Sequence, residues 1–162
     1  MKHTLSCLVY NRPGVLAKIA STFAVEGINI YSLAAGEVEE EEKSRMTIVV
    51  EADEDTVKRA EEHLVKINEV IKLFDLLEQE LIAMELLLIK IRIRPKNIPQ
   101  ILQIAEIFNA QVIAVSEEAM VLTLASEEKR VDGLVKMLKP FKIVEMSRSG
   151  KLAVRGVEQE VS

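Results

Sequence analysis

The stretch that decides the fold is YNRPGVLAKIAS, which runs from Tyr10 to Ser21. It joins a strand-like run, His3–Tyr10, to a helical pattern of apolar residues at i, i+3 and i+4 spacing. Pro13 is tolerated where a helix begins because it has no N–H to lose, and Gly14 lets another backbone or a ligand approach closely. The stretch therefore predicts a strand, a tight turn and a helix whose first backbone N–H groups lack intrahelical partners.

The same order of elements then occurs twice along the chain. In the first half, alternation and helical periodicity predict strands at 3–10, 29–35, 44–52 and 69–77 and helices at 14–25 and 54–67, with Gly27 ending the first helix. In the second half they predict a strand at 81–93, a turn and helix at 95–110, a hairpin at 111–126, a helix at 127–141 and a last strand at 142–150. The fold class is therefore α+β, with two ferredoxin-like βαββαβ domains at 1–78 and 79–162.

Each predicted sheet carries both of its helices on one face, so the other face needs a cover. Leu86, Leu88, Ile91 and Ile93 make the long strand apolar on both sides, which favours a partner sheet, helix or subunit behind it. Dimerisation is the economical solution. The residues from Ser147 onward are polar, and we expect them to be less ordered.

Composition excludes several classes of protein. Among 162 residues, 26 are acidic and 21 basic, for a net charge of −5, which argues against a nucleic-acid-binding surface. No apolar run reaches the roughly 18–20 residues of a membrane helix. The N-terminus lacks the layout of a signal peptide, so a cytoplasmic location is expected.

The residues that could support catalysis are few. Cys7 and His3 share one strand about 13 Å apart, too far for a nucleophile–base pair. His63 lies on the charged side of a helix, where it is expected to be exposed. No sequence motif for a metal, a nucleotide phosphate or a catalytic serine is present. The acidic run Glu37–Glu42 is expected to be a solvated hairpin tip, and Arg148 is only a weak candidate for anion binding.

The opening turn has the chemistry to hold a free amino acid. Backbone donors at Gly14, Val15 and Leu16 would face outward at the positive end of the helix dipole, which favours a carboxylate by about 0.3–1 kcal/mol. The side chain of Asn11 can meet either a carboxylate or an ammonium. By themselves, however, these residues favour the simpler interpretation of a Pro-Gly turn that merely caps the helix.

A family resemblance adds to this picture. The stretch NRPGVLAKIASTFAVEGINIYSL, followed by SRMTIVV, resembles the ACT domain, a small-molecule-sensing module of βαββαβ fold. With LLLIKI, AEIFNAQVIAV and FKIVEMSRSGKLAVRG in the second half, nearly the whole chain resembles the small regulatory subunit family of acetolactate synthase. The resemblance implies a non-catalytic homodimer that activates a large catalytic subunit and confers feedback inhibition by valine or a related branched-chain amino acid. It places thiamine diphosphate, FAD and magnesium on that catalytic subunit and no cofactor on this chain.

The resemblance also implies an effector site shared by two subunits. One subunit would contribute Asn11 and the opening of the first helix, Gly14, Val15 and Leu16, while Asn29 and Ile30 would come from its neighbour. The two asparagines would hold the amino and carboxyl groups, and Leu16 and Ile30 would touch the side chain. Gly36 lies near this region but is only a weak candidate for the effector site. The second domain would serve as scaffold and docking surface.

Three alternatives remain open. The nearest is a freestanding ACT-domain sensor that acts on another partner. The others are a small enzyme on a ferredoxin-like fold and a merely structural dimer.

Overall fold

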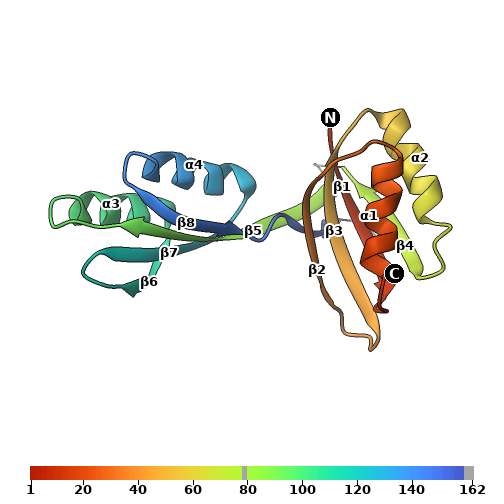
Figure 1. The fold of residues 1–162 in the computed structure, drawn as a ribbon, viewed down its shortest axis with the longest axis horizontal. Helices are drawn as coiled ribbons and strands as arrows, with labels where there is room; N and C mark the ends of the chain where they lie inside the picture. The colour runs from red at the N-terminus through yellow and green to blue at the C-terminus, as the bar shows by residue number, and fades with distance from the viewer. Residues whose placement is uncertain (78–79, 159–162) are drawn as a thin grey trace. The chain divides into compact units, whose positions relative to one another are not determined.

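The fold is taken from a computed structural model, and it is described for residues 1–77 and 80–158. Contacts along the chain define two units. The first unit contains Met1–Ala83 together with the segment that begins at Lys151, and the second unit is Met84–Gly150. Each unit combines an antiparallel sheet with two helices (Figure 1).

The first unit follows the order predicted for the first half of the sequence. Its elements are β1 (Lys2–Tyr10), α1 (Val15–Val25), β2 (Ile30–Glu37), β3 (Lys43–Glu51), α2 (Glu54–Leu64) and β4 (Val70–Leu76). The four strands lie in the order β2-β3-β1-β4, all antiparallel. Gly27, with φ +72°, follows the last turn of α1 as expected, because glycine adopts this left-handed conformation without strain.

The core of the first unit lies between its sheet and its helices. Alternate residues of β1 point toward α1 and α2, and their partners on β3 do the same, as in the pairs Leu5–Ile48 and Cys7–Met46. The two helices add their buried stripes to the same cluster. These helix residues are Val15, Ile19, Phe23, Val57, Ala60 and Leu64.

The face of this sheet that points away from the helices is also buried, and the chain covers part of it with its own last strand. That strand, β9 (Leu152–Arg155), contacts β1. The Ala153 N–H donates to Thr47 Oγ1 at 3.4 Å, and the Arg155 guanidinium lies 4.6 Å from the centre of the Phe74 ring. Ala153 is 5% exposed and Thr47 3%, so this contact excludes water.

Two expectations about the end of the chain differ from this arrangement. The segment after Ser147 was expected to be less ordered, yet it contains β9, a strand too short for its alternation to be distinctive in the sequence. The expected domain boundary assigned the whole C-terminal part to the second domain, whereas β9 groups with the first unit because it packs on that unit's sheet. The boundary itself, at 78/79, and the last four residues, 159–162, lie outside the described residues.

A charge at Ala153 should therefore destabilise the first unit. We expect Ala153→Asp to lower the free energy of unfolding by about 2–4 kcal/mol, because its carboxylate would be buried without a partner. Leu152→Asp is the matched control, since Leu152 is 54% exposed and points the other way along the strand. Urea unfolding monitored by circular dichroism measures both, and equal stability of the two variants would contradict the role given to β9.

The second unit repeats the fold of the first. Its elements are β5 (Leu81–Arg92), which begins in the first unit, α3 (Ile98–Phe108), β6 (Gln111–Val115), β7 (Ala119–Ser126), α4 (Glu128–Leu138) and β8 (Ile143–Arg148). The strand order β6-β7-β5-β8 matches that of the first sheet, element for element. Figure 1 shows α3 and α4 on one face of this sheet. The prediction of two ferredoxin-like βαββαβ domains is confirmed.

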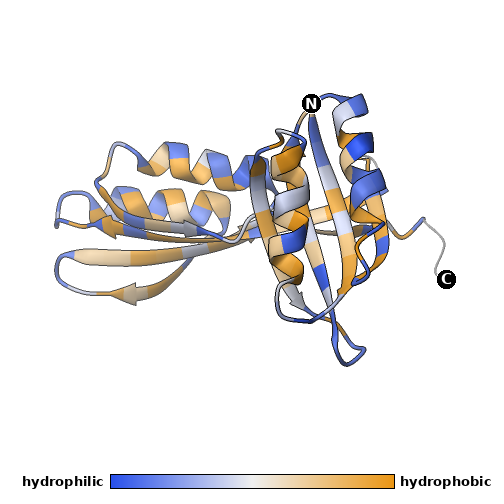
Figure 2. Ribbon diagram, turned by 45° about the vertical axis from the view of Figure 1, so that its right-hand side comes forward, coloured by the Kyte–Doolittle hydropathy of each residue, from blue (hydrophilic) through white to orange (hydrophobic). Residues whose placement is uncertain are grey.

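The long strand β5 has two different faces in the second unit. Ile91 and Ile93 lie in the core beneath α3 and α4, whereas Leu86 and Leu88 point to the opposite face and are 44% and 41% exposed. Figure 2 shows apolar colour along the strands of both units and a mixture of apolar and hydrophilic colour on the helices. The sequence expectation of apolar residues on both faces therefore holds, and the outer face is open in the single chain.

Arg148 forms ion pairs within the second unit that the sequence did not indicate. Its Nε donates to Glu85 Oε1 at 2.7 Å, its Nη2 pairs with the same oxygen, and its Nη1 lies 2.7 Å from Asp132 Oδ1. The group thereby links β8 to β5 and to α4. Because its guanidinium is already engaged by two carboxylates, the suggestion that Arg148 binds an anion is not supported.

Candidate functional site

The turn between β1 and α1 is held by backbone hydrogen bonds on both sides. The Tyr10 N–H donates to Glu69 O at 2.9 Å, and the Arg12 N–H donates to Tyr10 O at 2.9 Å. Gly14 then takes the left-handed conformation, with φ +85°, as the residue before the helix. A side chain would be strained there, which is the physical reason for a glycine at this position.

Of the three backbone donors predicted at the opening of α1, two are free. The Val15 N–H donates within the turn, to Arg12 O at 3.3 Å, and the Val15 side chain is buried in the core. The N–H groups of Gly14 and Leu16 have no hydrogen-bond partner among the described residues, and no side chain caps the helix. Leu16 is 46% exposed beside them, so an apolar side chain accompanies the free donors.

Asn11 connects this turn to the acidic hairpin. Its backbone N–H donates to Glu42 O at 2.7 Å, and its side-chain Nδ2 lies 3.5 Å from Glu37 Oε1. Glu42 adopts a positive φ of 62° where the hairpin turns back. The glutamates of the acidic run are exposed, so the expected solvated hairpin tip is confirmed, and two hydrogen bonds attach this hairpin to the turn.

Charged side chains also surround the turn, from α1, from the turn itself and from the segment just before β4. The Glu69 carboxylate, 13% exposed, accepts from Lys18 Nζ at 2.7 Å, and this hydrogen bond lowers the pKa of Glu69. Its second oxygen, Oε2, is buried without a partner. The Arg12 guanidinium lies over the Tyr10 ring, 4.8 Å from its centre. The site thus combines free N–H donors, two cationic side chains and two carboxylates around one helix start.

The remaining candidates lie at the far end of the same unit. Asn29 and Ile30 stand at the start of β2, whereas the Asn11 turn adjoins the end of that strand, at Glu37. A strand of this length spans about 23 Å at roughly 3.3 Å per residue. One chain therefore does not bring Asn29 and Ile30 to Asn11. Gly36 pairs with Arg45, on the sheet face that points away from the helices.

The groups considered for catalysis are engaged elsewhere. Cys7 is fully buried, and this burial raises the pKa of its thiol to about 11, so the thiol is not a nucleophile at neutral pH. The His3 Nδ1 lies 2.9 Å from Asp75 Oδ2, and its Nε2 is buried without a partner. The His63 side chain is 49% exposed and pairs with Glu26, so its predicted surface position is confirmed. Within the described residues, no three His, Cys, Asp or Glu side chains gather as they would around a metal ion.

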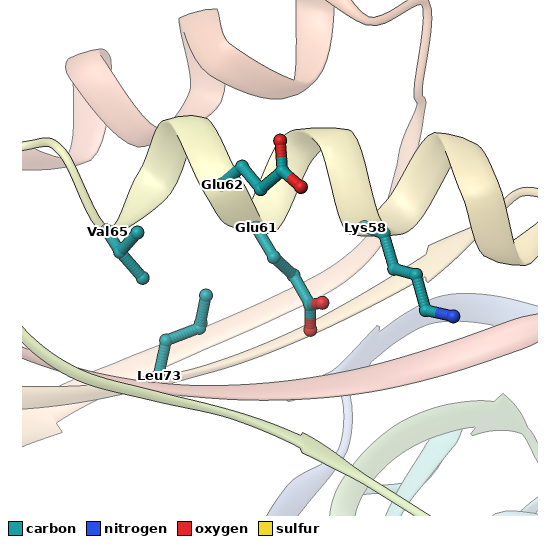
Figure 3. A pocket seen from close by; sticks show the side chains of 5 residues that line it. All are labelled: Lys58, Glu61, Glu62, Val65 and Leu73. Carbon is teal, nitrogen blue, oxygen red and sulfur yellow. The ribbon is translucent and has the colours of Figure 1, made fainter.

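A shallow hollow lies beside α2, away from the turn. Figure 3 shows its lining, in which Glu61 points from the helix toward the strand that carries Leu73, and Glu62 points the other way. Burial, and after it the charge of Asp75, raises the pKa of Glu61. The folded state therefore binds this proton more tightly than the unfolded state does. The protein should lose some stability as the pH rises through the folded pKa of Glu61. The hollow lacks the convergent donors that a ligand carboxylate would need.

Two family models together match most of the chain. Residues 84–156 match the model described as the small subunit of acetolactate synthase, and residues 5–72 match the AHAS small subunit-like ACT domain. A protein of Archaeoglobus fulgidus described as a probable acetolactate synthase small subunit is 38% identical, covering 96% of this chain and 98% of that protein. The acetolactate synthase small subunit of Mycolicibacterium smegmatis is 37% identical, covering 94% of this chain and 89% of its own.

The chain belongs to the acetolactate synthase small-subunit family. The fold agrees with this assignment, since a crystal structure of the small subunit from Thermotoga maritima matches 96% of this chain and 98% of that one with a TM-score of 0.89 and 33% identity. The resemblance seen in the sequence is confirmed, and with it the ACT domain of the first unit. No helix among the described residues of this small-subunit family member is long and apolar enough to cross a membrane.

Several residues around the site were not found from the sequence. Lys18 and Glu69 lie 51 positions apart, and Asn11 and Glu37 lie 26 apart, so only the packing of β4 and of the hairpin brings each pair together. The signal that could have selected Glu37 is its position at the end of a strand, before the acidic turn begins. In the sequence it was one of a run of glutamates.

Proposed function

We propose that this member of the small-subunit family is a non-catalytic regulatory subunit that binds a branched-chain amino acid at the opening of α1. The observation that carries the proposal is the pair of free N–H groups at Gly14 and Leu16, next to the side chain of Asn11. A helix start with free donors favours a carboxylate. The exposed side chain of Leu16 supplies an apolar surface beside it.

A second copy of the chain would complete the site. The strand β2 is at the edge of its sheet, so its outer backbone groups can pair with another β2 across a two-fold axis. Antiparallel pairing places the start of one β2 opposite the end of the other. Asn29 and Ile30 of one copy would thereby approach Asn11 of its partner, which removes the separation of about 23 Å within one chain.

The partner that the family implies is the large catalytic subunit of acetolactate synthase, a transferase. We place thiamine diphosphate, FAD and magnesium on that subunit and no cofactor on this chain, with the complex in the cytoplasm. Valine, or a related branched-chain amino acid, would act by binding one arrangement of the paired first units more tightly than another. A coupling free energy of about 1–3 kcal/mol between effector binding and the catalytic subunit would change catalytic activity or effector affinity several-fold or more.

Two measurements test this function. A thermal-shift screen of the pure chain against the twenty amino acids should raise its melting temperature with a branched-chain amino acid and with no others. Addition of the chain to its catalytic subunit should raise acetolactate formation and make it sensitive to the same amino acid. If the chain bound that amino acid but no thiamine-dependent enzyme co-purified with it, the freestanding sensor would replace this proposal.

A further inference from the structure

We propose that Glu37 accepts hydrogen bonds from the ammonium group of the effector and thereby makes the site select amino acids over simple carboxylic acids. The inference rests on the proposed function of the same site and adds the side chain that binds the ammonium group of the ligand. The acidic hairpin, which the sequence suggested is merely solvated, thus acquires a role in recognition.

Glu37 lies on the helix-bearing face of the sheet, and its side chain is exposed. It is the last residue of β2 and pairs with Ser44 of β3, a residue that is 6% exposed. Two and four residues earlier on β2, Ala35 and Leu33 pair with Met46 and Ile48, which point into the core beneath the helices. Because side chains alternate along a strand, Glu37 lies on this same face. The other glutamates of the run, at 39–42, lie beyond the strand in the turn.

The hairpin is held against the turn that would bind the ligand. The Asn11 N–H donates to Glu42 O at 2.7 Å, and the Val38 N–H donates to Lys43 O at 3.2 Å, which closes the hairpin just after Glu37. The contact from Asn11 Nδ2 to Glu37 Oε1, at 3.5 Å, is long for a hydrogen bond. Glu37 thus contacts Asn11, three residues before Gly14 in the turn, and is still able to accept a stronger partner.

The charge of Glu37 is also uncompensated. Glu26, Glu54 and Glu69 each have a cationic partner, whereas no ion pair involving Glu37 occurs within residues 1–77 and 80–158. A ligand with only a carboxylate would bind the helix start at the cost of repulsion from Glu37. An amino acid carries an ammonium on the carbon next to its carboxylate, so one ligand can satisfy the free N–H groups and Glu37 together.

The test compares amino acids with their deaminated analogues. L-valine, L-leucine and L-isoleucine are titrated into the full-length chain alongside isovalerate, 4-methylpentanoate and 3-methylpentanoate, with binding measured by thermal shift and calorimetry. We expect Glu37→Gln to weaken binding of the preferred amino acid by about tenfold or more, as for loss of a charged hydrogen bond. Affinity for the matching analogue should stay the same or rise, so the ratio of the two affinities collapses.

Glu41→Gln is the matched control, because it removes the same charge from the same hairpin at an exposed residue outside the strand. It should leave the affinity ratio within about twofold of that of the unsubstituted chain. If Glu37→Gln kept the ratio of the control, the inference would be overturned while the proposed function stood. If the unsubstituted chain bound none of the three amino acids, both would fall.

Discussion

We expect a chain that carries Gly14→Asp to lose the proposed response to an amino-acid effector while it still activates the catalytic subunit. The new carboxylate would stand where the free N–H groups meet the incoming carboxylate. A Cβ at Gly14 meets nothing within 4 Å, so the side chain fits without displacing a neighbour. Two like charges about 4 Å apart repel by about 4 kcal/mol near a protein surface, so we expect at least a hundredfold loss of effector affinity.

The backbone makes a control necessary for this variant. Gly14 has φ +85°. For a residue with a side chain, the left-handed conformation costs about 1–2 kcal/mol of conformational energy, and the cost is smallest for asparagine and aspartate. Gly14→Asn has nearly the same shape and backbone cost but no charge, so it should keep most of the effector affinity. Effector titrations of the reconstituted enzyme measure both variants. Full sensitivity of the Gly14→Asp enzyme would show that the effector binds elsewhere.

Arg148→Ala should be among the most damaging substitutions in the second unit. It leaves the Glu85 carboxylate, 6% exposed, without its cationic partner in the interior. Breaking a buried pair from one side costs about 3–5 kcal/mol, and the 28% exposure of the Arg148 side chain places our expectation near the lower end. Urea unfolding of the full chain should show a selective loss of stability in the second unit.

Two further variants separate the buried charge from the lost contact. Asp132→Ala removes the other partner of Arg148. The Asp132 side chain is 56% exposed, so this variant should lower the free energy of unfolding by less than about 1 kcal/mol. The double variant Arg148→Ala/Glu85→Leu removes the uncompensated charge and should recover much of the stability. If the double variant were as unstable as Arg148→Ala, buried charge would not be the cause.

Much of the fold could be predicted from local patterns. The helical spacing of Val15, Ile19 and Phe23 determines which face of α1 is buried, and Gly27 determines where the helix ends, because both effects act within one or two turns. The end of α2 was less certain, since the helix stops at Leu64 rather than at the predicted Ile67. The residues after Leu64 retain a helical pattern, but hydrogen bonds to closer carbonyls close the chain into turns.

For the candidate site, too, the sequence indicated some residues and missed others. The sequence indicated Asn11, Gly14 and Leu16 because they are neighbours in one turn. It did not indicate that the Val15 N–H is used within that turn, since this depends on the conformation that Gly14 adopts. Nor could it select Glu37 from its run of glutamates.

The sequence by itself determined the order of strands and helices, the buried face of each and the glycine-dependent opening of α1. Periodicity and backbone preference act over a few residues, so they can be recognised in a single chain of letters. Only the tertiary structure decided that β9 covers the first sheet, that Arg148 neutralises Glu85 and that the acidic hairpin lies beside Asn11. These contacts join residues far apart in the chain, and their geometry depends on strand register, which is set when the whole sheet packs.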